Sequence, residues 1–383
     1  MNRLFRWMLL SCIAAVLAAN LPAKVQAAYS ASSGSAILME QSTGRILYEK
    51  DAYTKKRIAS ITKIMTAILA IESGKLDTKA KVSEKAVRAE GSSIYLQPGE
   101  KILLEDLVYG LMLRSGNDSA VAIAEHVGGS LEGFVYLMNK KAEEIGMINT
   151  HFANPHGLDD HEDHYSTAYD MAVLTRYAMN NETYRKIAGT KMHRAPNPNE
   201  SWDRVWKNKN RLLTEMYEYC TGGKTGYTKR AKRTLVTTAS KDGLDLIAVT
   251  LNGPDDWNDH IGMYESGFKE YSLKKVIEQG GVRELEDSPY EKKAYLKTDY
   301  SYPASEEEKD LFRVEYKMLK PSGSWKEDKD FPDVVGRAIV YFENKQVKSL
   351  PIYYEKEPQK EEKSFLDFFK SIFLTMAGVK TDG

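Results

Sequence analysis

The first residues that could do chemistry are Ser60 and Lys63, which are three positions apart in the run Ser60-Ile61-Thr62-Lys63. This spacing places both side chains on one face of a helix. A serine hydroxyl is a weak nucleophile and needs an adjacent base. A lysine can act as that base when burial or nearby positive charge lowers its pKa. The pair therefore predicts nucleophilic catalysis, although the same pattern also occurs at ordinary helix starts.

Two further polar motifs follow this pair. Ser115-Gly116-Asn117 lies in a break between two helical patterns, where a loop can present a second hydroxyl and an amide. Lys224-Thr225-Gly226 precedes a predicted β-hairpin, and its lysine and threonine could hold a carboxylate at a strand edge. Gly226 would let a substrate backbone approach closely. Each motif alone is consistent with a simple turn, but the three in this order are far more specific.

Other patterns that could carry chemistry are weaker. The run His161-Glu162-Asp163-His164 differs from the H-E-x-x-H zinc motif and lies in a polar, loop-like stretch, so no metal site is predicted. The sequence has neither a G-x-S-x-G elbow nor a phosphate-binding glycine loop, and no cofactor is expected. The 23 tyrosines are interpreted as core and interface residues rather than as a ligand-stacking platform.

The elements that must position these motifs can be predicted from hydrophobic periodicity. A hairpin is expected over Ser35–Lys50 and a helix from about Ser60 to Ser73. Two more helices and a second hairpin are expected over Leu103–Leu113, Ala120–Val127, Thr234–Ser240 and Leu244–Leu251. Strands at both ends and helices between them predict a sheet built from the two ends of one domain and covered by helices.

The pattern changes after the second hairpin. A catalytic domain is expected over 28–275, and a small β domain over 282–356, where Phe312–Met318, Ala338–Phe342 and Val347–Ile352 are predicted strands. An amphipathic helix is predicted over 363–379. It has no apolar run long enough to span a bilayer, so we expect it to lie in a membrane interface. Docking on the core of the protein is the alternative.

Composition and the N-terminal residues constrain the class of protein. The 383 residues suggest two domains, and 54 basic against 54 acidic residues leave no basic field for nucleic acid. Arg3 and Arg6, the apolar run Trp7–Ala19 and the cleavage site Val25-Gln26-Ala27 predict a signal peptide over 1–27. Export to the outer face of the cytoplasmic membrane, with peripheral attachment, is therefore expected.

The two cysteines add little to this interpretation. Cys12 follows a short apolar run and is itself followed by another, so a signal peptide that contains a cysteine is favoured over a lipoprotein. Cleavage after Ala27 would leave Cys220 as the sole cysteine, which allows no internal disulfide. The same cleavage would leave 51 basic and 54 acidic residues.

With its three motifs in this order, the chain resembles the penicillin-binding and β-lactamase superfamily, and is most similar to the serine D-Ala-D-Ala carboxypeptidases of peptidase family S11. The likeness covers most of the chain. It includes the runs Arg57-Ile58-Ala59, Asn154-Pro155-His156-Gly157-Leu158, His164-Tyr165-Ser166-Thr167-Ala168 and Lys224-Thr225-Gly226-Tyr227-Thr228. Within the family, the chain looks closest to a branch from endospore-forming bacilli, which implies a role in spore cortex maturation.

The resemblance implies a fold, an activity and roles for residues. The fold is an α/β catalytic domain of the β-lactamase/DD-peptidase type, with a mostly antiparallel five-stranded sheet and a helical lobe. Ser60 would attack the terminal D-Ala-D-Ala bond of peptidoglycan stem peptides, and β-lactams would acylate the same serine. The other implied catalytic residues are Lys63, Ser115 and Lys224. The implied substrate-binding residues are Asn117, Thr225, Gly226, Tyr227 and Arg233.

Two departures from the family pattern leave the second carboxylate-binding cation open. Ala231-Lys232-Arg233 stands where many relatives carry a small Ala-Gly pair, and Asp245 stands where some carry arginine. Arg233 is the cation predicted here. Three alternative functions also remain: a β-lactamase with Glu162 as deacylating base, a transpeptidase, and a catalytically silent peptidoglycan-binding protein.

Overall fold

The computed structural model describes residues 29–356, apart from 199, 284, 286–287 and 326. The chain divides into two compact units between Ser272 and Leu273. The predicted signal peptide over 1–27 and the predicted amphipathic helix over 363–379 lie outside the described residues. Among the described residues, no helix has the length and hydropathy needed to span a bilayer.

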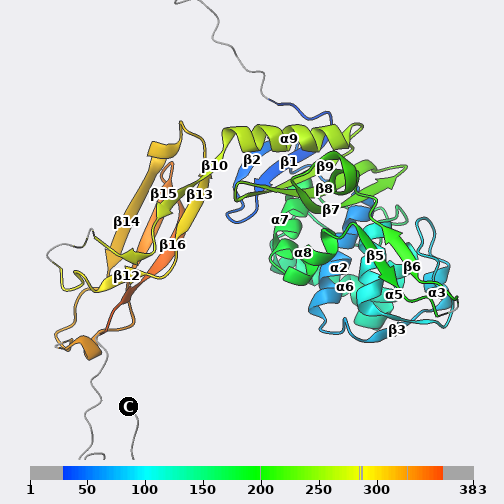
Figure 1. Cartoon of the computed structure of the whole chain (residues 1–383), viewed down its shortest axis with the longest axis horizontal. Helices are drawn as coiled ribbons and strands as arrows, with labels where there is room; N and C mark the ends of the chain where they lie inside the picture. Colours follow the sequence, from blue (N-terminus) through cyan, green and yellow to red (C-terminus); the bar gives the residue numbers. More distant parts are fainter. Residues whose placement is uncertain (1–28, 199, 284, 286–287, 326, 357–383) are drawn as a thin grey trace, which may run out of the picture. The chain divides into compact units, whose positions relative to one another are not determined.

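A five-stranded sheet forms the centre of the first unit (Figure 1). All neighbouring strands are antiparallel. Their order across the sheet is β2 (Ile46–Lys50), β1 (Ser35–Glu40), β9 (Leu244–Leu251), β8 (Lys232–Lys241) and β7 (Cys220–Thr228). The first two strands come from the start of the unit and the others from its end. Both predicted hairpins are confirmed, and so is a sheet assembled from both ends of the domain.

The two faces of the sheet bury different apolar sets because successive side chains of a strand point to opposite faces. On β1, Ile37 and Met39 belong to the large core shared with the helices, whereas Ala36 and Leu38 belong to a smaller core. That smaller core includes Met263 and Tyr264 of α9, Asp256–Glu270. Figure 1 shows α9 along one face of the sheet and α7, Ala168–Met179, on the opposite side.

In sequence, a helical lobe lies between the first two strands and the last three strands of this sheet. Its other helices are α2 (Lys63–Glu72), α3 (Glu84–Val87), α4 (Leu104–Tyr109), α5 (Asn117–Gly128), α6 (Leu131–Glu144) and α8 (Glu182–Ala188). Two short hairpins join it, β3 (Lys79–Lys81) with β4 (Lys101–Leu103) and β5 (Met192–Ala195) with β6 (Arg204–Lys207). Two π-helical turns complete it, η2 (Gly110–Arg114) and η3 (Leu212–Met216).

The predicted helix from Ser60 begins differently from the expectation. Ser60 lies in a 3₁₀ turn, η1 (Ala59–Thr62), and the α-helix α2 starts only at Lys63. Ala59 has a φ of 49°, a left-handed conformation that costs energy in any residue with a side chain. The turn therefore changes the chain direction just before the predicted nucleophile, which an apolar periodicity cannot reveal.

The second unit is made of strands and short turns in its described residues. One sheet has the order β11 (Gly280–Gly281), β12 (Ala294–Leu296), β16 (Lys345–Tyr354), β15 (Val334–Phe342) and β14 (Phe312–Met318). The remaining elements are the pair β10 (Ser272–Ile277) and β13 (Tyr300–Ala304), and the 3₁₀ turns η4 (Lys309–Leu311) and η5 (Asp328–Asp330). The three predicted strands fall on β14, β15 and β16. Most of β10 belongs to this unit, so the first domain ends before the predicted boundary at residue 275.

Candidate active site

The structure brings Ser60 and Lys63 into direct contact. The ammonium nitrogen of Lys63 lies 3.0 Å from the Ser60 hydroxyl. Lys63 is fully buried in the first turn of α2, whereas Ser60 is partly accessible. A reachable hydroxyl beside a buried amine is the arrangement that a serine nucleophile and its base require. The side-by-side placement predicted from the spacing is therefore confirmed.

Lys63 has two further acceptors, which fix its position. Its Nζ donates to Asn117 Oδ1 at 2.7 Å and to the His156 carbonyl at 2.7 Å. Burial lowers the pKa of Lys63 well below its usual value, and the nearby charges of Lys224 and Lys209 lower it further. Because a lower pKa favours the neutral amine, Lys63 is suited to accept a proton.

A second lysine–serine pair lies close to the first. Lys224, on β7, is buried and donates from Nζ to Ser115 Oγ at 3.1 Å and to the Thr225 carbonyl at 2.6 Å. Ser115 ends the turn η2 with a left-handed φ of 64°, which turns the chain back toward the site before α5 begins. Burial, followed by the charge of Lys209, lowers the pKa of Lys224 to about 7.

The strand β7 runs close beside the nucleophile turn, and Gly226 makes this approach possible. A Cβ at Gly226 would lie 2.4 Å from Thr234 Oγ1 and 3.0 Å from the backbone nitrogen of Ser60. The neighbouring Thr234 hydroxyl donates to the Ile58 carbonyl at 2.9 Å and joins β8 to the same turn. Any larger residue at 226 would push the strand away from Ser60. The glycine thus serves the packing of the site, and its role in substrate access stays a prediction.

A loop over residues 153–164 holds Lys63 in place through the His156 carbonyl. Asn154 Oδ1 accepts from the backbone of Gly157 at 2.7 Å, and the resulting turn directs the His156 carbonyl to Lys63. Gly157 has a φ of 86°, and a Cβ there would lie 1.9 Å from the Ala59 carbonyl oxygen. The loop therefore packs directly on the turn that carries Ser60.

His164 connects the far end of this loop to the nucleophile turn. Its Nδ1 accepts from the backbone of Ala153 at 3.0 Å, so Nε2 carries the proton that faces Thr62 Oγ1 at 2.8 Å. The Thr62 hydroxyl in turn donates to the Ala59 carbonyl at 2.8 Å. Burial lowers the pKa of His164 to about 4, which keeps the ring neutral near pH 7. Among the described residues, no cluster of three metal-ligating side chains occurs.

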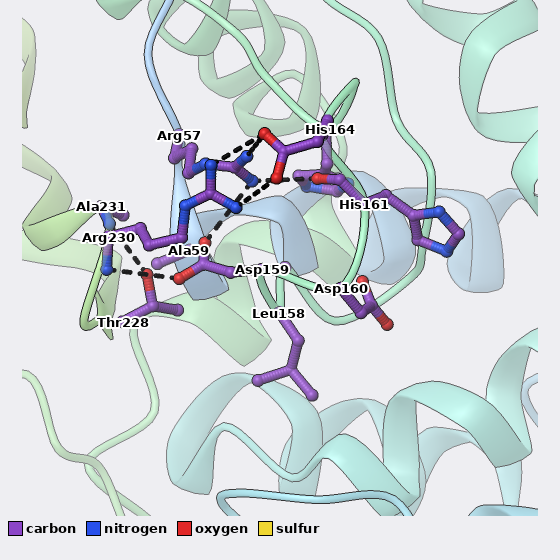
Figure 2. Close-up of polar contacts among 12 residues, drawn as sticks. Arg57, Ala59, Leu158, Asp159, Asp160, His161, His164, Thr228, Arg230 and Ala231 are labelled. Carbon is purple, nitrogen blue, oxygen red and sulfur yellow. Dashed lines mark hydrogen bonds and ion pairs between the residues drawn. The ribbon is translucent and has the colours of Figure 1, made fainter.

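Glu162 lies on the outer side of the loop, between two arginines. Its carboxylate accepts from Arg57 Nη2 at 2.7 Å and from both terminal nitrogens of Arg230 at 2.6 and 2.8 Å. Figure 2 shows Arg57 and Arg230 side by side at this loop, with the His161 ring pointing away from them. Hydrogen bonds from Arg230, together with the charge of Arg57, lower the pKa of Glu162 to about 2. Such a carboxylate is a poor base, and both of its oxygens already have partners.

We expect Glu162→Gln to leave the lifetime of a penicilloyl-enzyme within about fivefold of the unchanged protein. A deacylating general base contributes roughly 100- to 10,000-fold, so its loss would slow hydrolysis by that factor. Stopped incubation with a fluorescent penicillin, followed by the decay of the label, measures the lifetime. Asp163→Asn is the matched control, because Asp163 is an exposed carboxylate of the same loop. A thousandfold longer lifetime in Glu162→Gln alone would restore Glu162 as the base.

The other predicted substrate-binding residues have distinct surroundings. Asn117 is buried. Its Oδ1 accepts from Lys63 Nζ, and its Nδ2 donates to the Glu90 carbonyl at 2.5 Å. Thr225 is partly accessible and Tyr227 is exposed on β7. Arg233 lies opposite Tyr227 on β8, where it donates to Asp256 Oδ1 at 2.9 and 2.6 Å and lies over the Trp257 ring. Its role as a carboxylate-binding cation stays a prediction, and Asp256 competes for its charge.

Two further groups contribute to this site without a signal in the sequence. Lys209 acts on both buried lysines through its charge, and its own Nζ lies 3.4 Å from Ser92 Oγ. The His156 carbonyl holds Lys63 through the main chain. A backbone acceptor has no residue-type signature, and Lys209 lies in a polar run far from any of the three motifs. Only the tertiary structure brings these groups to the site.

Fold and site together define a class of serine enzyme with two lysine–serine pairs at the edge of an antiparallel sheet. The family model of D-alanyl-D-alanine carboxypeptidases, Peptidase_S11, matches residues 22–255. The chain belongs to this family. The resemblance drawn from the motifs is therefore confirmed.

Individual relatives agree with this assignment. The chain is 39% identical over 254 residues to the D-alanyl-D-alanine carboxypeptidase DacF of Bacillus subtilis, a match that spans 64% of each chain. The solved structure of a Streptomyces K15 DD-transpeptidase mutant matches 63% of this chain and 100% of that chain, with 31% identity and a TM-score of 0.60. The carboxypeptidase DacD of Francisella tularensis supports the fold alone, since it is 24% identical, with a TM-score of 0.64 over 90% of this chain and 98% of that chain.

Proposed function

We propose that this protein is a serine D-Ala-D-Ala carboxypeptidase that removes the terminal D-alanine from peptidoglycan pentapeptide stems. The observation that carries the proposal is the presence of two buried lysines, each hydrogen-bonded to a serine hydroxyl. One pair can create a nucleophile and the other can return a proton. Membership of the S11 family supplies the substrate class.

The proposed reaction begins at Ser60. Lys63 accepts the hydroxyl proton while Ser60 Oγ bonds to the carbonyl carbon between the two D-alanines. The backbone N–H groups of Ser60 and Tyr227 stabilise the oxyanion, and each such donor is typically worth about 3 kcal/mol. The C–N bond then breaks as Ser115 passes its proton to the nitrogen of the leaving D-alanine, and Lys224 reprotonates Ser115. Water attacks the acyl-enzyme and gives a proton to Lys224, while Lys63 returns its proton to Ser60 Oγ.

The other site residues are proposed to hold the substrate. Lys224 and Thr225 bind the terminal carboxylate, and Asn117 and β7 bind the peptide backbone next to the scissile bond. A β-lactam mimics this end of the peptide and acylates Ser60. The mechanism uses side chains and water, and no cofactor enters it.

Product analysis distinguishes this function from the two other catalytic candidates. Incubation with a muropeptide pentapeptide is expected to yield the tetrapeptide and free D-alanine, as measured by mass spectrometry. Cross-linked products would instead favour a transpeptidase, a candidate suggested by the likeness to the Streptomyces DD-transpeptidase structure. Rapid turnover of penicillin would favour a β-lactamase. Absence of any product and of penicillin labelling would favour a silent peptidoglycan-binding protein.

We expect kcat/KM to fall as the pH rises through about 7. The pKa of Lys224 is about 7, and its proposed role requires the ammonium form, which is lost above that pH. Because kcat/KM reports ionisation of the free enzyme, this decline should be visible in its pH profile. Lys224→Arg keeps the charge at all these pH values, so the surviving activity should lack the decline. An unchanged alkaline limb in Lys224→Arg would assign it to another group.

We also propose that the exported enzyme attaches peripherally to the outer face of the cytoplasmic membrane through residues 363–379. The support is the sequence pattern alone, in which large apolar residues recur at helical spacing after a charged stretch. Truncation before Ser364 is expected to release the enzyme from membranes with turnover of a small D-Ala-D-Ala peptide within about twofold. Fractionation and assay of both forms test this. A truncated form that stays on membranes excludes this anchor, and one that is inactive indicates that the segment packs on the protein.

A place in spore cortex synthesis is the final part of the proposal. It rests on the resemblance to the branch from endospore-forming bacilli, with which the 39% identity to the Bacillus subtilis relative agrees. Muropeptide analysis of spores from a deletion strain tests it, and an unchanged cortex would contradict it.

A further inference from the structure

A groove of about 1280 Å³ lies next to the chain segment that leads into Ser115. Its lining comes from the loop Ser93–Glu100 and from β6 with the residues that precede it, including Trp202. Arg114 also lines the groove, and the next residue in the chain is Ser115. The groove therefore adjoins the segment that carries the proposed proton donor, although none of the three motifs contributes to its lining.

A buried carboxylate couples this groove to the motif Ser115-Gly116-Asn117. Asp118, which is 1% exposed, accepts hydrogen bonds from Ser93 Oγ at 2.6 Å and from the backbone nitrogens of Ile94 at 3.1 Å and Leu96 at 3.2 Å. The neighbouring Asn117 donates its backbone N–H to the Ser92 carbonyl at 2.6 Å. The start of α5 thus fixes both the site and the loop that lines the groove.

The shape imposed on this loop presents an aromatic ring to solvent. Tyr95 has a φ of 61°, which is rare for a bulky residue, and its backbone N–H donates to Ser93 Oγ at 2.8 Å. Its side chain is nevertheless 80% exposed. Strained backbone persists where surrounding contacts impose it, and it is concentrated at ligand sites. The contacts that impose this conformation bury the flanking Ile94 and Leu96 and leave the Tyr95 ring exposed at the groove, where a ligand could contact it.

The groove is pre-formed and chemically mixed. Glu100 and Arg204 join its two lining segments through bonds of 2.8 and 3.1 Å, and their side chains are 1% and 8% exposed. A buried ion pair with two hydrogen bonds fixes the position of one segment relative to the other. The accessible lining includes a second exposed ring, Trp202, together with charged residues of both signs, which are Arg114, Lys207, Glu200 and Asp203. Exposed rings among mixed polar groups suit a ligand that has apolar faces and many hydroxyls.

We propose that this groove binds the sugar portion of the peptidoglycan strand to which the stem peptide is attached. The inference rests on the proposed function, because the sugar is covalently continuous with that substrate. A pyranose offers an apolar C–H face to Tyr95 and Trp202 and hydroxyl and amide groups to the polar lining. Binding energy from such a remote part of the substrate can be used to promote reaction at the scissile bond. The site would make the enzyme prefer glycan-linked stems over free peptides.

The test compares two substrates that share one pentapeptide, one free and one linked to its disaccharide. With the purified full chain, kcat/KM for D-alanine release is expected to be higher for the linked substrate. Tyr95→Ala and Trp202→Ala are each expected to lower that preference by about five- to tenfold, corresponding to about 1 to 1.4 kcal/mol, and to leave the free peptide unchanged. Tyr95→Phe keeps the ring and should keep the preference. Tyr136→Ala is the matched control, because Tyr136 is an exposed tyrosine on α6 outside the groove.

The outcomes separate this inference from the function on which it rests. If the unchanged protein releases D-alanine from neither substrate, the proposed function fails. If it cleaves both but Tyr95→Ala and Trp202→Ala keep the full preference, the groove does not bind sugar. Equal losses on the free and linked substrates would show that the groove binds peptide instead, which also overturns the proposal.

Discussion

Replacement of Ser60 by alanine is expected to abolish both D-alanine release and covalent penicillin labelling. Removing the nucleophile of a serine peptidase lowers kcat by on the order of a million-fold. Here Lys63 Nζ lies 3.0 Å from the Ser60 hydroxyl, and alanine leaves no hydroxyl at that position to attack a carbonyl carbon. Release of D-alanine from a pentapeptide and gel fluorescence with a labelled penicillin measure the two losses.

Ser73→Ala is the matched control for this variant. Ser73 follows the other end of α2 and donates its hydroxyl to the Ala70 carbonyl at 2.7 Å, away from the lysine pairs. We expect it to keep both activities. Normal labelling of Ser60→Ala would show that another residue is acylated, and the proposed mechanism would then be wrong.

Lys63→Arg is expected to lower the acylation rate by about 100- to 10,000-fold, the usual contribution of a general base. Arginine keeps a positive charge, but its pKa is too high for it to accept the Ser60 proton. Burial and the charges of Lys224 and Lys209 lower the pKa of Lys63. A guanidinium at the same position would stay protonated. The rate of penicillin acylation, measured from labelling time courses, tests this effect without requiring turnover.

Two controls separate basicity from packing at this position. Lys85→Arg makes the same change at an exposed lysine of α3 and should acylate normally. Thermal unfolding of Lys63→Arg shows whether the larger side chain is accommodated among Asn117 and the His156 carbonyl. A folded Lys63→Arg protein with near-normal acylation would show that Lys63 supplies charge rather than basicity.

The sequence was sufficient to predict the elements that have a regular apolar pattern. The residues of high β propensity in β8 and β9, joined by the turn Lys241-Asp242-Gly243, indicated the second hairpin, which the structure confirms. The spacing of Ser60 and Lys63 correctly placed the two side chains together, because a local separation of three residues nearly fixes their geometry. The order of the three motifs was specific enough to indicate the family.

Features that depend on distant contacts could not be predicted in this way. The 3₁₀ turn before α2 follows from packing of Gly157 on the Ala59 carbonyl and of Gly226 beside the Ser60 backbone. Glu162 could be interpreted as a base from its place near the motifs, whereas the structure shows it between Arg57 and Arg230. The strained loop around Tyr95 is held by Asp118, 23 residues later in the chain. Such pairings carry no periodic signal in one sequence.

The most direct test of the account is to locate the penicillin adduct by mass spectrometry. The full chain is incubated with a penicillin, digested with a protease, and each peptide is searched for the added mass. A single modified peptide is expected, with the adduct on Ser60. An adduct on Ser115, or the absence of any adduct on a folded protein, would contradict the assignment of Ser60 as the nucleophile.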